Sequence, residues 1–206
     1  MKVKVYVEGG GDGKSTLIAC RRAFSKLIQK AGLTGRMPGI VACGPRNGAF
    51  DRFSTAFGTP GEFPLLLVDS ERPVASASEE PASEAAWEHL ESSDGWQRPP
   101  GATAEQAQLM ATCMEAWILA DRQGLRTIFG PSLQTGSLPP ASTLENREAR
   151  ELQRILKEAT RNCGRGKAYR KGLRSFQVLE QVEAEALKRS LPHFRRWIAT
   201  LSRHLA

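Results

Sequence analysis

The chain opens with a regular alternation of hydrophobic and polar positions. Residues 2–7 place a valine at every second position, which predicts a β-strand with one buried face. From Ser15 to Ala31, apolar residues recur every three or four positions, and basic residues occupy the opposite face. This period predicts an amphipathic helix, and Gly32 is a typical stop signal for it.

Two more apolar segments extend this pattern. Gly39–Cys43 has the length of a short buried strand, and residues 47–57 fit a helix. Residues 63–68 form an apolar run of the kind that parallel sheets bury on both faces. The order strand, helix, strand, helix, strand predicts an α/β fold whose mainly parallel sheet is flanked by helices, with right-handed crossovers.

The second half of the chain is predicted to be mainly helical. Thr103 is expected to open a helix through Ala120, with Gln106 completing a capping box. The expected core-facing stripe of this helix is Leu109, Cys113, Ala116, Trp117 and Ala120. Further helices are expected over residues 145–162, 176–189 and 192–205.

Composition indicates how these elements are organised. Residues 72–102 are rich in Pro, Ser, Ala and Glu, which predicts a long surface excursion with one short helix at 84–90. With 206 residues, 40% of them hydrophobic and 25% charged, the chain is neither disordered nor fibrous. We expect one domain over residues 1–206, made of a sheet core (1–71), the excursion (72–102) and a mainly helical portion (103–206).

Several classes of protein are excluded. No apolar run approaches the roughly 20 residues that span a bilayer, and the charged first strand is no signal peptide. We therefore expect a cytoplasmic protein without membrane segments. The four cysteines include no Cys-x-x-Cys pair and the three histidines do not cluster. A structural zinc site is not expected, and the cysteines should be reduced.

The net charge of +7 is unevenly distributed. Residues 1–46 carry nine basic and two acidic side chains (+7), and residues 47–146 carry five and fourteen (−9). Residues 147–206 carry fifteen and six (+9). The pattern fits an acidic metal-binding centre between phosphate-binding segments. Solvent-exposed surfaces that carry opposite net charges, without a metal or phosphate site, would give the same charge distribution.

The glycine-rich turn after the first strand is similar to a phosphate-binding P-loop, but it lacks one essential residue. That motif requires Gly-x4-Gly-Lys-Ser/Thr, and position 8 is Glu8 instead of the first glycine. A carboxylate there would face the phosphates that the loop should hold. A small phosphotransferase that binds ATP through Lys14 is accordingly kept only as a third alternative.

Three carboxylates are predicted to meet at one edge of the sheet. Glu8 follows the first strand, and Asp69 and Glu71 follow the buried strand at 63–68. In α/β sheets ligands bind at the carboxyl ends of the strands, and clustered carboxylates are stabilised by a cation. Mg²⁺, or Mn²⁺ in its place, is the expected ion because it prefers hard oxygen ligands. The alternative is that these residues cap nearby helices and turns.

A glutamate after one strand and an Asp-x-Glu motif after another resemble the topoisomerase–primase (Toprim) catalytic domain. The chain also resembles a family of small bacterial Toprim-like proteins. The resemblance implies a Rossmann-like fold with a helical C-terminal portion and a metal-dependent nuclease subunit. Such proteins tend to be encoded beside an AAA- or SMC-like ATPase in phage-defence operons, which implies an ATPase partner. The shared segments are Val7-Glu-Gly-Gly-Gly-Asp12, Gly39-Ile-Val-Ala-Cys-Gly44, Leu67-Val-Asp-Ser-Glu71, Met114-Glu-Ala-Trp117, Tyr169-Arg-Lys-Gly172 and Ser175-Phe176.

The same resemblance assigns roles to individual residues. Glu8 corresponds to the Toprim glutamate, a general acid/base or metal ligand, and Asp69 and Glu71 correspond to the metal-binding pair. Glu71 stands where the common pattern has aspartate, so its side chain is one methylene longer. Asp12 is a fourth carboxylate or a helix N-cap. Glu115 is a ligand or a neighbour of the ligands, with a salt bridge, for instance to Arg122, as the alternative.

A basic loop at residues 161–174 supplies cations. It contains six basic residues, one aromatic residue and no acid, which favours phosphate contacts and base stacking. Lys167 or Lys171 could stabilise charge on a scissile phosphate, and Arg46 follows a strand at the same sheet edge. The expected nucleic-acid contacts are Arg46, Arg161, Arg165, Lys167, Tyr169, Arg170, Lys171 and Arg174.

Together these features predict a metal-dependent nuclease subunit that cleaves DNA or RNA with an ATPase partner in anti-phage defence. Glu8, Asp69, Glu71, Lys167 and Lys171 would be its catalytic residues, and Glu115 and Asp12 additional metal ligands. A non-catalytic module that binds nucleic acid or the ATPase is the alternative. A homodimer and a monomer are both compatible with the sequence.

Overall fold

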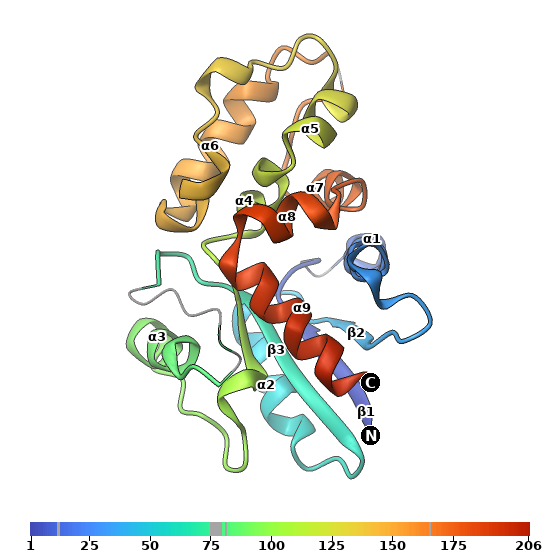
Figure 1. Cartoon of the computed structure of the whole chain (residues 1–206), viewed down its shortest axis with the longest axis vertical. Coiled ribbons are helices and arrows are strands. Elements are labelled where there is room, and N and C mark those ends of the chain that lie inside the picture. The colour runs from blue at the N-terminus through green and yellow to red at the C-terminus, as the bar shows by residue number, and fades with distance from the viewer. Residues whose placement is uncertain (12, 75–79, 81, 165) are drawn as a thin grey trace.

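The structure, a computed structural model, describes residues 1–11, 13–74, 80, 82–164 and 166–206 (Figure 1). Two of the predicted site residues, Asp12 and Arg165, lie outside the described residues.

A parallel sheet forms the centre of the fold. Its strands are β1 (Lys2–Val7), β2 (Gly39–Ala42), β3 (Glu62–Asp69) and β4 (Ala107–Met110), in the order β2-β1-β3-β4. Every pair in the sheet is parallel. The predicted α/β fold with a parallel sheet flanked by helices is therefore confirmed.

Helices cover both faces of this sheet. Among the apolar side chains of β1 and β3, the odd-numbered ones join one cluster with α1 and α9. The even-numbered Tyr6, Leu66 and Val68 join another with α2 and α3. This division follows from the alternation of side chains along a strand. The four helices are α1 (Lys14–Ile28), α2 (Arg46–Ala56), α3 (Ala85–Asp94) and α9 (Pro192–His204).

The remaining helices lie beyond the carboxyl edge of the sheet, with α5 and α6 at the end of the molecule opposite the two termini (Figure 1). Trp117 of α4 links them to the sheet, because its ring packs against Phe24 of α1 and Trp197 of α9. These helices are α4 (Met114–Ala120), α5 (Arg122–Phe129), α6 (Ala149–Thr160), α7 (Leu173–Leu179) and α8 (Ala184–Ser190). Shorter turns are a π-turn at Gln29–Leu33 and 3₁₀ turns at Ala104–Gln106, Thr135–Ser137 and Ala141–Asn146.

The helix predicted from Thr103 to Ala120 is wrong. The capping box between Thr103 and Gln106 exists, but it closes a single 3₁₀ turn. Ala107–Met110 then forms β4, which pairs with Leu66–Asp69 of β3, and the helix α4 begins only at Met114. All four residues of β4 are buried. A fully buried strand lacks the alternation of polar and apolar residues that would distinguish it from a buried helix segment.

Two smaller expectations also change. The helix predicted at 176–189 is two helices, α7 and α8, separated by residues 180–183. Helix α5 was not predicted, although its N-cap signal is present: the carboxylate of Asp121 accepts a hydrogen bond from the Gly124 N–H at 2.9 Å. In the described part of the chain, no helix combines the length and apolar character needed to cross a bilayer.

Candidate metal centre

The carboxylates of Glu8, Asp69 and Glu71 meet at the carboxyl edge of the sheet. Glu8 directly follows β1 and Asp69 ends β3, and these strands are paired through the Glu8 N–H, which donates to the Leu67 carbonyl at 3.0 Å. One carboxylate oxygen from each of the three residues lies within 4.8 Å of the others. The structure thus brings together the three acidic residues that the spacing of the strands predicted.

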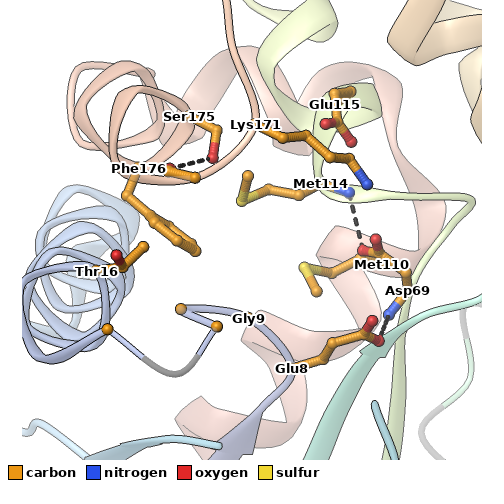
Figure 2. Close-up of a pocket in the computed structure, with 14 residues that line it drawn as sticks. Glu8, Gly9, Thr16, Asp69, Met110, Met114, Glu115, Lys171, Ser175 and Phe176 are labelled. Carbon is orange, nitrogen blue, oxygen red and sulfur yellow. Dashed lines mark hydrogen bonds between the residues drawn. The ribbon is translucent and has the colours of Figure 1, made fainter. Parts of the chain in front are cut away.

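Backbone amides hold two of these carboxylates in place (Figure 2). The Met114 N–H, at the start of α4, donates to Asp69 Oδ1 at 2.9 Å. The Asp69 N–H in turn donates to Glu8 Oε2 at 3.2 Å. Helix α4 therefore orients Asp69, and the end of β3 orients Glu8.

Burial makes the charged forms of these carboxylates unfavourable. Asp69 is buried, and burial raises its pKa well above the usual range; Glu8, Glu115 and Glu71 add to this, whereas Lys171 opposes it. Burial also raises the pKa of Glu8, against the opposing effects of Arg46 and the Asp69 N–H. A bound cation would compensate this desolvation, and carboxylate oxygens are the ligands that Mg²⁺ and Mn²⁺ prefer.

Arg46 lies beside the carboxylates, but protein groups occupy its guanidinium. Its Nε and Nη2 each donate to Asp94 at 2.8 Å. Its Nη1 lies 3.3 Å from Glu8 Oε2 and donates to the Asp69 carbonyl. The guanidinium carbon also lies 4.9 Å from the ring centre of Trp96. Arg46 therefore orients Glu8 and neutralises part of its charge, rather than offering free donors to a nucleic acid.

Glu71 differs from its two neighbours because it is exposed and has a left-handed backbone, with φ of 62°. This conformation is uncommon for a residue other than glycine and costs about 1–3 kcal/mol. Two hydrogen bonds hold it: the Glu71 N–H donates to the Thr112 carbonyl at 2.8 Å, and its carbonyl accepts from the Ala149 N–H at 3.3 Å. The protein thus maintains an unfavourable backbone at a predicted metal ligand.

Glu115 and Tyr169 form a buried pair. The tyrosine hydroxyl donates to Glu115 Oε1 at 2.6 Å. Tyr169 is only 3% exposed and Glu115 only 1%. The alternative of a salt bridge to Arg122 is not observed, since the Arg122 guanidinium donates to the Pro139 carbonyl. Burial also removes the Tyr169 ring from the surface, so it offers no face on which a base could stack.

Among the described residues of the basic loop, Lys171 is the cation that lines the same pocket as the carboxylates. Its side chain extends between Glu115 and Asp69 (Figure 2). Lys167, Arg161 and Arg170 are exposed, as phosphate contacts would need to be. Arg174 is more enclosed, because its Nη2 donates to the Lys167 carbonyl at 3.2 Å and it lies over the ring of Phe129.

Of these groups, Glu8, Asp69, Glu115 and Lys171 line a pocket of about 340 Å³. Much of its wall is formed by side chains to which no sequence motif assigns a role. The signal for three of them was present, because Met114, Ser175 and Phe176 belong to segments that carried the family resemblance. The lining residues are Glu8, Gly9, Gly10, Gly11, Gly13, Thr16, Asp69, Met110, Met114, Glu115, Lys171, Gly172, Ser175 and Phe176.

A second hollow, of about 620 Å³, lies between later turns of α1 and α7. Its basic side chains include Arg22, which pairs with Glu180 at 2.8 Å, and Lys30, which pairs with Glu183 at 2.8 Å. Lys26 has no partner within the described ranges. We call this hollow the α1/α7 groove; it is lined by Arg22, Lys26, Lys30, Arg174, Gln177, Glu180, Gln181 and Glu183.

The fold and the site define an α/β protein with an acidic cluster at the carboxyl edge of a parallel sheet. Residues 7–202 match the family described as "Domain of unknown function (DUF4276)", and the chain belongs to that family. Among solved structures, it is similar to the C-terminal region of the Burkholderia pseudomallei OLD protein. The identity is 15% and the TM-score 0.49, over 99% of this chain and 98% of that one. None of the curated proteins shows significant sequence similarity to it.

Proposed function

We propose that this protein is a Toprim-like, metal-dependent nuclease subunit that hydrolyses phosphodiester bonds in DNA or RNA. The observation that supports this most strongly is the meeting of Glu8, Asp69 and Glu71 at one sheet edge, with oxygens within 4.8 Å of one another. The order of these residues along two adjacent parallel strands is also the order of the Toprim motif.

The residues present fit Mg²⁺ or Mn²⁺. Metal–oxygen distances of about 2.0–2.1 Å bring the ligand oxygens of one Mg²⁺ within about 4 Å of one another. The three carboxylates would reach this spacing through small rotations of their side chains, with Glu8, Asp69 and Glu71 as ligands. Asp12 and Glu115 are additional candidates. When bound, the metal would polarise the phosphate and lower the pKa of a water molecule.

Other groups of the chain would bind the phosphate. The Lys171 ammonium is positioned to offset charge that develops on a phosphoryl oxygen. The N–H groups of Gly10 and Gly11 make no hydrogen bond to any described residue, and both residues line the pocket. Because glycine has no side chain, a nucleic-acid backbone can approach these donors closely.

The exposed cations of the basic loop would extend this contact. Arg161, Lys167 and Arg170 are exposed and can reach successive phosphates, and Arg165 and the more enclosed Arg174 belong to the same loop. The family resemblance adds an AAA- or SMC-type ATPase as the partner and anti-phage defence as the setting. The cytoplasm is the location expected from the sequence pattern.

The proposal is tested by incubating the full-length protein with Mg²⁺ or Mn²⁺ and single- and double-stranded DNA and RNA, with and without the neighbouring ATPase. Glu8→Gln and Asp69→Asn each remove one ligand charge, so we expect cleavage to fall at least 100-fold. Glu185→Gln, on an exposed residue of α8, is the matched control and should cleave normally. Unchanged cleavage in both site variants would contradict the proposal.

Metal binding provides a second measurement that does not depend on cleavage. Titration calorimetry with Mn²⁺ should detect a site in the wild-type protein and in Glu185→Gln. The same titration should show a much weaker site in Asp69→Asn. Equal Mn²⁺ affinity in all three proteins would remove the metal centre from the mechanism, and nucleic-acid binding without metal dependence would instead favour a non-catalytic module.

A further inference from the structure

The pocket has two chemically different ends (Figure 2). At one end lie the charged groups, Glu8, Asp69 and Lys171, where a phosphate and a metal would bind. At the other end lie Phe176 and the hydroxyl groups of Thr16 and Ser175.

Between the two ends the pocket has an apolar wall. The side chains of Met110 and Met114 lie along it, from the carboxylates towards Phe176 (Figure 2). A metal and a phosphate alone would not require these thioethers, since their ligands are charged or polar. Methionine is flexible and polarisable, and it makes favourable contacts with aromatic rings.

The facing wall is backbone without side chains. Gly9, Gly10 and Gly11 have φ values of 125°, 96° and 50°, which strongly favour glycine over other residues. A Cβ atom on Gly10 would lie 2.8 Å from Leu17 Cδ2, and one on Gly9 would lie 3.1 Å from Phe176. Glycine therefore lets the turn pack closely against α1 and Phe176, and this wall of the pocket presents backbone instead of side chains.

The size of this pocket limits its occupant. A volume of about 340 Å³ is at the small end of the roughly 300–1,000 Å³ typical of ligand pockets. It suits a single nucleotide unit and not the end of a stacked, paired duplex. A base that enters such a pocket must first leave the stack, which costs least in a single strand.

We propose that the pocket holds one nucleobase of the nucleotide next to the scissile phosphate, between Met110 and Met114 on one side and the glycine turn on the other, with Phe176 at its far end. This inference rests on the proposed nuclease function and specifies its substrate class. The substrate is a single-stranded nucleic acid, or an unpaired nucleotide in a longer one. The Thr16 hydroxyl lies where it can meet a polar edge of the base, whereas the Ser175 hydroxyl already donates to the Gly172 carbonyl at 2.7 Å.

Binding of small nucleotides tests the base pocket separately from cleavage. In the Mn²⁺-loaded protein, calorimetry should show that AMP binds roughly five- to 100-fold more tightly than ribose 5-phosphate, the range expected for stacking of one base. Both compounds carry the same phosphate, so the difference measures the base alone. Equal affinities, or no binding of either compound, would overturn the inference.

Met114→Ala should reduce this preference for AMP, because it removes the thioether but leaves the backbone N–H that binds Asp69. Met114→Leu keeps an apolar side chain of similar volume and should retain most of the preference. Met37→Ala, at another half-buried methionine that packs against the core, is the control and should behave as the wild type. If Met114→Ala folds normally by circular dichroism and still prefers AMP over ribose 5-phosphate as strongly as the wild type, Met114 does not contact the base.

Cleavage of a single-stranded oligonucleotide with one abasic site tests the same inference on a polymer. The phosphodiester next to the abasic position should be cut at least fivefold more slowly than the same bond in the intact strand. If the strand is cut uniformly and this cutting requires metal, the proposed base pocket would be contradicted, whereas the proposed nuclease function would be supported. Selective binding of AMP without cleavage of any nucleic acid, with or without the ATPase, would instead contradict the hydrolytic function.

Discussion

Tyr6 and Tyr169 are the two tyrosines of the chain, and each donates its hydroxyl to a glutamate. Their surroundings differ. Glu62, the partner of Tyr6 at 2.5 Å, also pairs with Lys4, whereas no Lys or Arg pairs with Glu115 among the described residues. Tyr169 is therefore the principal partner of a buried acid, and it lies two residues before Lys171 in the basic loop.

Tyr169→Phe should lower the free energy of unfolding by about 1–3 kcal/mol, because it leaves a buried acceptor without its donor. It should also lower kcat without weakening Mn²⁺ binding, since the segment that carries Lys171 loses its attachment to α4. Thermal unfolding, calorimetry and single-turnover cleavage measure these effects.

Tyr6→Phe is the control for this substitution. It also removes a tyrosine hydroxyl. Tyr6, however, lies on the face of the sheet that packs against α2 and α3, and its hydroxyl bonds to Glu62 at the start of β3. Because this bond is remote from the carboxylate cluster, kcat should not change. A normal kcat in Tyr169→Phe, together with a lower melting temperature, would limit the pair to a structural role.

The sequence predicted the carboxylate cluster of the site but not the hydrogen bonds that surround it. Glu8, Asp69 and Glu71 could be grouped because the ends of parallel strands meet at one edge. The hydrogen bond between Glu115 and Tyr169 spans 54 positions, and no local pattern indicates such a pair. Arg46 was expected at this edge, but its bonds to Asp94 depend on how α3 packs.

At the scale of elements, α1 and α7 contribute to both hollows. Thr16, in the first turn of α1, lines the pocket, and Lys26, further along the same helix, lines the α1/α7 groove. The groove carries four basic and two acidic side chains, a balance of +2. A strand leaving the metal centre would find phosphate-binding side chains along α1.

Lys26→Ala should therefore weaken binding of a single-stranded oligonucleotide and reduce the slope of log K against log[salt] by about 1. Fluorescence anisotropy in Ca²⁺ over a range of salt concentrations measures both quantities. Lys2→Ala removes the same charge at the start of β1, at the other end of the sheet from the site, and should change neither. Identical salt slopes in the two variants would exclude the groove as a binding surface.

The elements themselves were predicted with uneven success, for a physical reason. Strands β1 and β3 and helix α1 have clear periodicity or a long apolar run, so the sequence alone identifies them. Strand β4 is four residues long and wholly buried. Its strand state depends on pairing with β3, a tertiary interaction that single-sequence patterns do not contain.

At the scale of the whole molecule, the acidic middle and the basic ends of the chain meet at one site. Asp69, Glu71 and Glu115 come from the acidic segment, and Lys171 comes from the basic C-terminal segment. The uneven charge of the sequence predicted this arrangement in outline. The depth at which Asp69 is buried could not be predicted, because it depends on the start of α4 lying against the end of β3.

This burial makes stability depend on pH and metal together. A carboxylate whose pKa is raised on folding stabilises the protein below its unfolded pKa, and that stabilisation is lost as pH rises through the folded pKa. For Glu8 and Asp69, the metal-free protein should therefore become less stable above about pH 4. Metal ligands must be deprotonated, so Mg²⁺ should stabilise more as pH rises.

We expect Mg²⁺ at 100 times its Kd to add about 2.7 kcal/mol of stability, which corresponds to a rise in Tm of roughly 5–11 °C for a chain of this size. Differential scanning calorimetry in EDTA and in Mg²⁺, at pH 5.5 and pH 8, measures the effect, which should be larger at pH 8. Asp69→Asn should show little response at either pH. A Tm shift that is independent of pH would contradict the assignment of these carboxylates as the ligands.

The distance along the chain between Asp69 and Lys171 also has a consequence for protein synthesis. These residues are 102 positions apart, which at about 5–20 residues per second takes roughly 5–20 s to translate. During that interval the nascent chain already contains its acidic residues but has neither the lysine nor α7. If the proposed function includes RNA, an enzyme that depends on Lys171 would be unable to cut its own messenger RNA until most of the chain has been synthesised.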